Sequence, residues 1–281
     1  MRFGYDGSGL GGWARQPHSR TVEGLIRAGL RPRGISPTPD AARLEVASRT
    51  DRGVSARANA LALWSDLTAA PLLRRMNTIS PELVFTAAAS ISQGFRVRSA
   101  VRRVYRYFEP VEPTHPEEYA RSVKLFQGRI DVRSFGREIP ARTPRWRSVE
   151  SVTVTLADGG RTIEVRAPSF VWGMVRKIVG SLREVGAGRL SVSRLEAAVA
   201  GETRLTLPMA EPEGLVLWDV EYPLEWEARW AGPNRYQQRC TRRRRDGLWQ
   251  QEQLLGALFA AFGSPGTGST AEPPPGREEL G

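Results

Sequence analysis

The segment from about residue 170 to residue 185 constrains the fold most, because its apolar side chains recur at helical spacing. They are Val171, Val175, Ile178, Val179 and Leu182. A helix with such a one-sided apolar stripe buries it against another layer of the protein. With about 100° between successive helical residues, Arg176 and Arg183 lie on one shoulder of the stripe, where an arginine can reach into a cleft. Lys177 points nearly away from the stripe, so we expect it in solvent.

Other segments alternate between apolar and polar residues, as the strands of a sheet do. We expect a short strand after Arg2, running into a glycine-rich turn, and further strands at residues 44–48, 59–64, 102–108, 152–154, 162–166 and 215–220. Alternation within 102–108 places Arg103, Tyr105 and Tyr107 on one face. Such rings and guanidinium groups can stack on bases and bind phosphates. Tyrosines in this pattern are also common as half-buried sheet residues.

Three further helices are indicated by their expected first residues. Thr21 opens a helix that runs through Leu30. Thr114 and Glu117 have the spacing of a capping box, as do Ser193 and Glu196. Glycines provide natural stops for these two helices, at residues 128 and 201.

The chain is strongly basic. Its 281 residues include 41 lysines and arginines against 30 acidic residues, which gives a formal net charge of +11. A surplus of this size favours a polyanionic partner, and nucleic acid is the commonest one. A generally basic, solubilising surface is the alternative. Hydrophobic residues make up 40% of the chain, enough for a substantial core.

Cysteine and histidine are scarce. Cys240 is the single cysteine, so a disulfide within the chain is impossible and an intracellular setting is expected. With two histidines, His18 and His115, a zinc site has almost no ligands to draw on. There is no apolar run long enough to span a bilayer, and no signal-peptide core at the start. We therefore expect a cytoplasmic protein with no metal and no membrane partner.

Several short motifs occur in a fixed order. The most specific is SRTDRGVSA at residues 48–56, which carries Asp51 in a loop between two predicted strands. A carboxylate in that position sits on a stiff frame suited to catalysis, although an ordinary polar hairpin loop has the same spacing. The other motifs are YDG (5–7), GW (12–13), TVEG (21–24), RVYRY (103–107), MVRKIVG (174–180), VGAG (185–188) and EGLVL (213–217).

Together these motifs resemble those of the TruA family of tRNA pseudouridine synthases. The resemblance spans residues 3 to 222, and the wording of residues 13–17, WARQP, looks closer to archaeal members. It implies an α+β fold of two similar domains, each a mixed or antiparallel sheet with helices on one side, which meet at a basic RNA cleft. It also implies a homodimer that binds tRNA and needs no cofactor.

The resemblance also assigns the reaction and its residues. Uridine would be isomerised to pseudouridine in tRNA, in the anticodon stem-loop at positions 38–40, with Asp51 as the catalytic carboxylate. Arg176 would pair with Asp51 through a bidentate guanidinium, and Tyr105 would stack on the target base and offer its hydroxyl as a general base. Arg49 would hold RNA and Leu215 would line the pocket. Arg103 and Tyr107 complete the expected substrate contacts.

Some positions depart from the family pattern. Ser55 stands where the family usually has histidine, GRIDV at 128–132 lacks the usual histidine and phenylalanine, and GFRVR at 94–98 is looser than the usual motif. These departures concern the tRNA contacts more than the chemistry. Structural alternatives also remain: Asp51 capping a turn, Arg176 in a surface ion pair, and Leu215 as plain core.

Two other functions fit parts of the sequence. One is a non-catalytic RNA-binding protein with the same fold, against which the intact Asp51, Tyr105 and Arg176 argue. The other is a glycosidase acting on free nucleosides, which would not need the positive charge and would typically pair two carboxylates around the sugar.

The proline-rich connection at 109–113 is the expected domain boundary. We expect an N-terminal domain at 1–110, a C-terminal domain at 111–222, and a basic segment with an amphipathic helix packed on the second domain at 223–262. The remainder, 263–281, has the composition of a disordered tail. Four consecutive arginines, Arg242 to Arg245, either contact tRNA phosphates or form a solvated basic run.

Overall fold

A computed structural model describes residues 1–110, 112–157, 160–232, 238–239, 242 and 250. Internal contacts group residues 1–232 into one compact unit. Most of the arginine run, most of the helix predicted after it and the whole tail lie outside the described residues. In the described ranges, no helix is long and apolar enough to cross a membrane.

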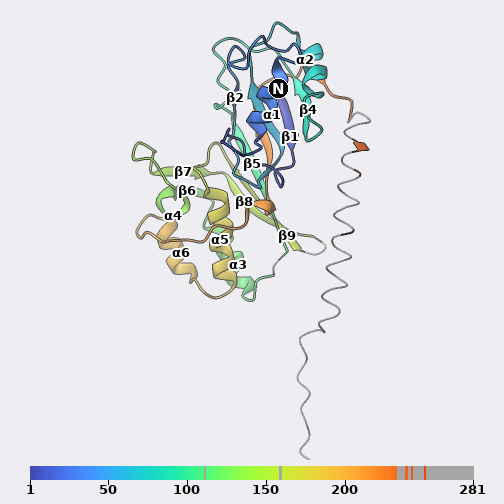
Figure 1. Cartoon of the computed structure of the whole chain (residues 1–281). Helices are drawn as coiled ribbons and strands as arrows, with labels where there is room; N and C mark the ends of the chain where they lie inside the picture. The colour runs from blue at the N-terminus through green and yellow to red at the C-terminus, as the bar shows by residue number, and fades with distance from the viewer. Residues whose placement is uncertain (111, 158–159, 233–237, 240–241, 243–249, 251–281) are drawn as a thin grey trace, which may run out of the picture. The chain divides into compact units, whose positions relative to one another are not determined.

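One mixed sheet runs through this unit (Figure 1). Among the described residues it has nine strands, with β2 paired to β3 beside the path β11-β4-β1-β3-β10-β5-β9-β8. Their bounds are β1 Arg2–Tyr5, β2 Glu45–Val46, β3 Ser55–Ala62, β4 Leu83–Ala88, β5 Arg102–Glu109, β8 Ser151–Ala157, β9 Gly160–Ala167, β10 Leu215–Glu221 and β11 Ala228–Arg229. A two-stranded sheet pairs β6 (Gly128–Asp131) with β7 (Trp146–Val149). The predicted α+β class with a mixed sheet is confirmed.

The helices form two groups within this unit. The helices α3 (Pro116–Lys124), α4 (Val132–Phe135), α5 (Met174–Gly186) and α6 (Val192–Val199) pack on one another, and α3 also contacts β8. Figure 1 shows them gathered near β8 and β9, whereas α1 (Val22–Leu30) and α2 (Ala69–Met76) lie near β1 and β4. A short 3-10 turn, η1 (Pro212–Gly214), leads into β10.

The late strand β10 joins the early and middle parts of the chain. It is parallel to β3, with Leu217 opposite Ala56, and antiparallel to β5, with Leu217 opposite Tyr105. Strand β10 thus lies between the strand that follows Asp51 and the strand that carries Tyr105. The sheet therefore crosses the predicted boundary at residues 109–113, and the division into two domains stays a prediction.

Four of the five residues of the predicted apolar stripe are buried in α5, whereas Val171 precedes the helix and is half-buried. Val175, Ile178, Val179 and Leu182 are each less than 5% exposed. The helix begins at Met174, later than expected, because Val171 to Gly173 form a turn and Gly173 has a left-handed φ of 76°. Lys177 is not in solvent as predicted. Its ammonium group donates to the carbonyl groups of Ser134 and Gly136, at 3.3 and 3.0 Å.

Both predicted capping boxes were wrong. Helix α3 has His115 at its N-cap, and Thr114 instead donates from its hydroxyl to the Gly186 carbonyl at 3.0 Å. Helix α6 begins two residues earlier than expected, because Ser191 accepts from the backbone N–H of Arg194. The cap predicted at Thr21 is present, with its side chain accepting from the Gly24 N–H.

Candidate active site

The loop that carries Asp51 connects β2 to β3 and is fixed from several sides. The backbone N–H of Trp13 donates to the Thr50 carbonyl at 3.0 Å, and the Tyr5 and Thr50 hydroxyl groups are 2.7 Å apart. Gly12 allows this close approach. It has a φ of 90°, and a Cβ there would lie less than 3.0 Å from backbone atoms of residues 50–52. The carboxylate therefore sits on a stiff loop.

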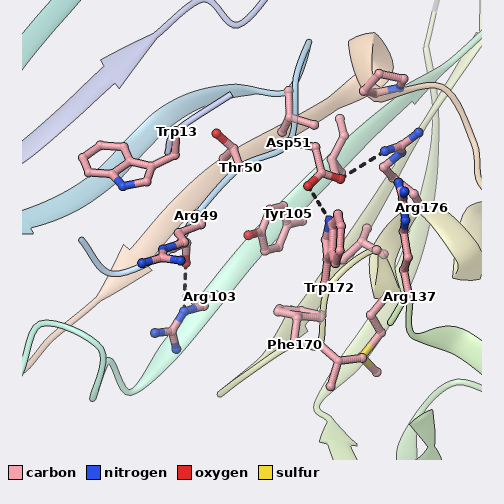
Figure 2. A pocket seen from close by; sticks show the side chains of 18 of the residues that line it. Trp13, Arg49, Thr50, Asp51, Arg103, Tyr105, Arg137, Phe170, Trp172 and Arg176 are labelled. Carbon is pink, nitrogen blue, oxygen red and sulfur yellow. Dashed lines mark hydrogen bonds and ion pairs between the residues drawn. The ribbon is translucent and has the colours of Figure 1, made fainter. Parts of the chain in front are cut away.

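Asp51 accepts hydrogen bonds at both carboxylate oxygens (Figure 2). Its Oδ2 accepts from Arg176 Nη1 at 3.0 Å, and its Oδ1 accepts from Trp172 Nε1 at 2.6 Å. The side chain keeps 26% of its surface exposed. Each carboxylate oxygen has two lone-pair directions, and the two donors use one on each oxygen. The group is therefore held in place and can still accept a further partner.

Arg176 is itself held by the backbone. Its Nε donates to the Ala210 carbonyl at 2.7 Å, and its side chain is 14% exposed. Only Nη1 reaches Asp51 in this structure, so the bidentate pair expected from the sequence is not formed. The ion pair joins residues that are 125 positions apart.

Tyr105 lies in β5, beside the Asp51 loop and 9% exposed. Its ring meets the Phe170 ring edge-on, with the centroids 5.1 Å apart. Burial raises the pKa of Tyr105 above its ordinary value of 10.0, with a smaller contribution in the same direction from the charge of Asp51. The phenol is therefore uncharged at neutral pH.

Arg103, which alternates onto the same face as Tyr105, is committed to the protein. It is 7% exposed and donates to the Ser48 hydroxyl and to the carbonyl groups of Ala47, Arg98 and Pro168. Although Arg103 borders the cavity, these bonds brace the segment that leads into the Asp51 loop.

The structure does not bring Tyr107 to the cavity. Its ring is 1% exposed, and its hydroxyl lies 3.3 Å from Glu211 Oε2 and 3.1 Å from Arg183 Nη2. Arg183 also ion-pairs with Glu109, which is buried. The second arginine on the shoulder of α5 thus belongs to a partly buried polar cluster.

Arg49 and Leu215 both border the cavity. Arg49 is exposed beside the loop, whereas Leu215 is 6% exposed at the start of β10. Figure 2 places Trp13 and Arg49 on one side of Tyr105, with Trp172 and Arg176 on the other. The cavity has a volume of about 1170 Å³, more than a single nucleotide needs.

The charge around this cavity is mainly positive. Its acidic lining residues are Asp51 and Glu213, whereas six arginines line it: Arg49, Arg52, Arg98, Arg103, Arg137 and Arg176. Such a lining attracts an anionic ligand. Within the residues described, no group of three or more His, Cys, Asp or Glu side chains is placed to hold a metal ion.

Sequence reasoning missed Trp172. Its indole is 45% exposed, borders the cavity and donates to Asp51. The only hint in the sequence was an aromatic residue two positions before the MVRKIVG motif. Pairing it with Asp51, 121 positions away, required the fold.

Several known proteins are similar in sequence to this chain. A family model described as "tRNA pseudouridine synthase" matches residues 123–223. A protein named "tRNA pseudouridine synthase A" from Thermococcus kodakarensis is 38% identical over 227 residues, which cover 79% of this chain and 84% of the relative. Its namesake from Methanothermobacter thermautotrophicus is 31% identical over 231 residues, 82% of each chain.

These relatives define the class of the protein as an RNA-modifying isomerase, a pseudouridine synthase. The chain belongs to the tRNA pseudouridine synthase A family, as the sequence motifs predicted. A solved chain titled "Crystal Structure of a Cbf5-Nop10-Gar1 Complex" matches 64% of this chain and 52% of its own length, at 12% identity and a TM-score of 0.30. That likeness is too slight to add to the assignment.

Proposed function

We propose that this enzyme converts uridine to pseudouridine in the anticodon stem-loop of tRNA, at positions 38–40, with Asp51 as its catalytic carboxylate. The observation that carries the proposal is the position of Asp51. It is an ionisable group held between Arg176 and Trp172 in a cavity bordered by six arginines. The family motif around it adds support.

The reaction needs a carboxylate and no external group. The N1–C1′ bond of uridine breaks, the base turns, and C5 bonds to C1′. The proton leaves C5 and a proton ends on N1, so atoms and electrons balance. Asp51 either attacks the sugar at C1′ or the base at C6, or stabilises an oxocarbenium-like centre and accepts a proton. Its ion pair with Arg176 places a cation 3.0 Å from the carboxylate oxygen and helps to orient the group for each of these roles.

Tyr105 would stack on the target base. Its ring borders the cavity and is backed edge-on by Phe170. Because burial raises its pKa, its hydroxyl would act at neutral pH as a neutral hydrogen-bonding group. A general-base role for Tyr105 would then require proton transfer to an uncharged phenol, which is a weak base. Leu215 would form part of the apolar wall.

The exposed arginines that border the cavity would bind the phosphates around a flipped nucleotide. Taking a base out of its stack costs a few kcal/mol, and contacts to the backbone and to the vacated space offset that cost. Arg49 is exposed at the cavity edge and is the residue we assign to this space. Arg103 and Tyr107 would support the site indirectly, through the hydrogen bonds that engage them.

The family resemblance also supports a cytoplasmic homodimer with tRNA across both subunits. Sedimentation of the protein alone and with tRNA tests this assembly. A dimer that binds tRNA is expected, and a monomer that modifies tRNA at full rate would overturn it.

A direct experiment separates this function from its two rivals. The purified protein is incubated with unmodified tRNA or with free uridine, and pseudouridine is mapped by mass spectrometry. We expect conversion within the anticodon stem-loop and none of free uridine. Conversion of free uridine would favour a nucleoside enzyme, and tight binding without conversion would favour a non-catalytic RNA-binding protein.

A further inference from the structure

We propose that Trp172 is a positioning residue for the Asp51 carboxylate, acting through its indole N–H. The inference rests on the proposed role of Asp51. Arg176 Nη1 and Trp172 Nε1 divide the two oxygens of Asp51 between them, at 3.0 and 2.6 Å. A charge-assisted bond to a carboxylate is stronger than a neutral one, and two donors fix the plane of the carboxylate better than one.

The backbone on either side of Trp172 holds the indole in place. The Trp172 carbonyl accepts from the backbone N–H of Arg137 at 2.8 Å. The next residue, Gly173, has a φ of 76°, which turns the chain directly into α5. Since Arg176 lies in the first turn of α5, the same short segment delivers both donors to Asp51.

Arg137 also packs against the indole itself. Its guanidinium carbon lies 4.6 Å from the centroid of the Trp172 ring. Cation–π contacts of this kind stabilise an exposed aromatic ring, and the Trp172 ring is 45% exposed. The indole is thus supported on one face while its N–H edge points at Asp51 (Figure 2).

This arrangement leaves the carboxylate usable. Asp51 keeps 26% of its side-chain surface exposed although both oxygens accept a bond. A carboxylate has about four lone-pair directions, so attack or proton transfer can use one that the two donors leave open. Losing the indole N–H would allow the carboxylate to rotate about its bond to Cβ, and small errors of orientation reduce rate more than binding.

The test compares two substitutions at Trp172 in the full-length protein with tRNA as substrate. Trp172→Phe keeps a flat ring against Arg137 and removes the N–H, whereas Trp172→His keeps a ring donor. We expect Trp172→Phe to lower kcat by about 10- to 100-fold with KM within about threefold, and Trp172→His to recover part of that loss. Trp64→Phe is the matched control, since Trp64 is 47% exposed and does not border the cavity.

Unchanged kcat in Trp172→Phe, or a rise in KM alone, would overturn the proposal, because either result means that Trp172 binds RNA or fills space. A spectroscopic arm keeps the test independent of turnover. The protein has eight tryptophans, and the indole N–H signal of Trp172 in an NMR spectrum is the one that Trp172→Phe removes. The chemical shift of this signal should change in Asp51→Asn and stay the same in Asp66→Asn. A signal that does not move rejects the contact. If Asp51→Asn keeps its activity while the signal moves, the role of Asp51 fails and the contact stands.

Discussion

At the scale of single residues, the arrangement of Arg176 makes a specific prediction. Its guanidinium bridges Asp51 and the Ala210 carbonyl, at 3.0 and 2.7 Å. Arg176→Ala leaves a partly buried carboxylate without its cation, so we expect single-turnover rates to fall by more than about 100-fold. Arg176→Lys restores the charge but cannot make both contacts, so we expect incomplete recovery. Full activity in Arg176→Lys would contradict the bridging role. Rates are measured with saturating tRNA.

The site residues show how much of the site could be predicted from the sequence. The motifs identified Asp51, Tyr105 and Arg176, and all three line one cavity. The motifs could not distinguish Tyr107 from Tyr105, because both lie on the same face of β5. The two tyrosines have different neighbours from β9, α5 and the segment before β10. No local sequence pattern indicates which of these distant segments each ring will contact. Trp172 stayed hidden for the same reason, since its contact with Asp51 is entirely tertiary.

At the scale of elements, the packing of α5 fixes the position of Arg176. Gly180 lies on the helix face that touches residues 208–210, and a Cβ there would be 2.2 Å from the Pro208 carbonyl oxygen. Alanine favours helices by about 1 kcal/mol over glycine. We nevertheless expect Gly180→Ala to lower stability by about 1–3 kcal/mol, because the contact is with backbone.

Gly94→Ala is the matched control for Gly180→Ala, since no atom lies within 4 Å of the added group. Thermal unfolding of both variants gives the comparison. A Gly180→Ala protein as stable as the Gly94→Ala protein would show that α5 can shift away from residues 208–210 at little cost.

Element boundaries were the less predictable part of the fold. The α5 stripe was readable because four of its apolar side chains share one face. Its start was not, since the turn before it depends on the left-handed Gly173 and on packing with Arg137 and Met209. At α3 and α6 the residues expected to cap the helix do not do so. Ser191 caps α6 in place of Ser193, and Thr114 donates to the end of α5 and does not cap α3.

At the scale of the whole molecule, arginines hold many carboxylates ionised. Burial alone would raise the pKa of Asp131, but hydrogen bonds from Arg133 and Arg145 outweigh it and leave that pKa below 3.8. Glu164 follows the same pattern through Arg106 and Arg166, with its pKa below 4.5. A pKa lowered on folding stabilises the protein above the unfolded pKa and loses that contribution as the pH falls through the folded one.

We therefore expect the unfolding temperature to be nearly constant from pH 7 to pH 5 and to fall below about pH 4. Asp131→Asn isolates the contribution of this carboxylate, because the asparagine side chain carries no charge at any pH. The gap in unfolding temperature between the parent and Asp131→Asn should shrink between pH 5 and pH 3. An equal gap at both pH values would mean that the ionised form of Asp131 does not stabilise the fold.

The central claim is that Asp51 carries the chemistry while the arginines of the site carry affinity. Asp51→Asn keeps the size of the side chain but offers one oxygen instead of two, so only one of Arg176 Nη1 and Trp172 Nε1 can keep its acceptor. The deciding measurement is single-turnover pseudouridine formation in tRNA, beside the Kd for tRNA, for the parent, Asp51→Asn and the exposed control Asp66→Asn. We predict that Asp51→Asn binds tRNA within about threefold of the parent and loses more than about a thousandfold in rate, with Asp66→Asn unchanged in both. A rate within tenfold of the parent in Asp51→Asn would contradict the account.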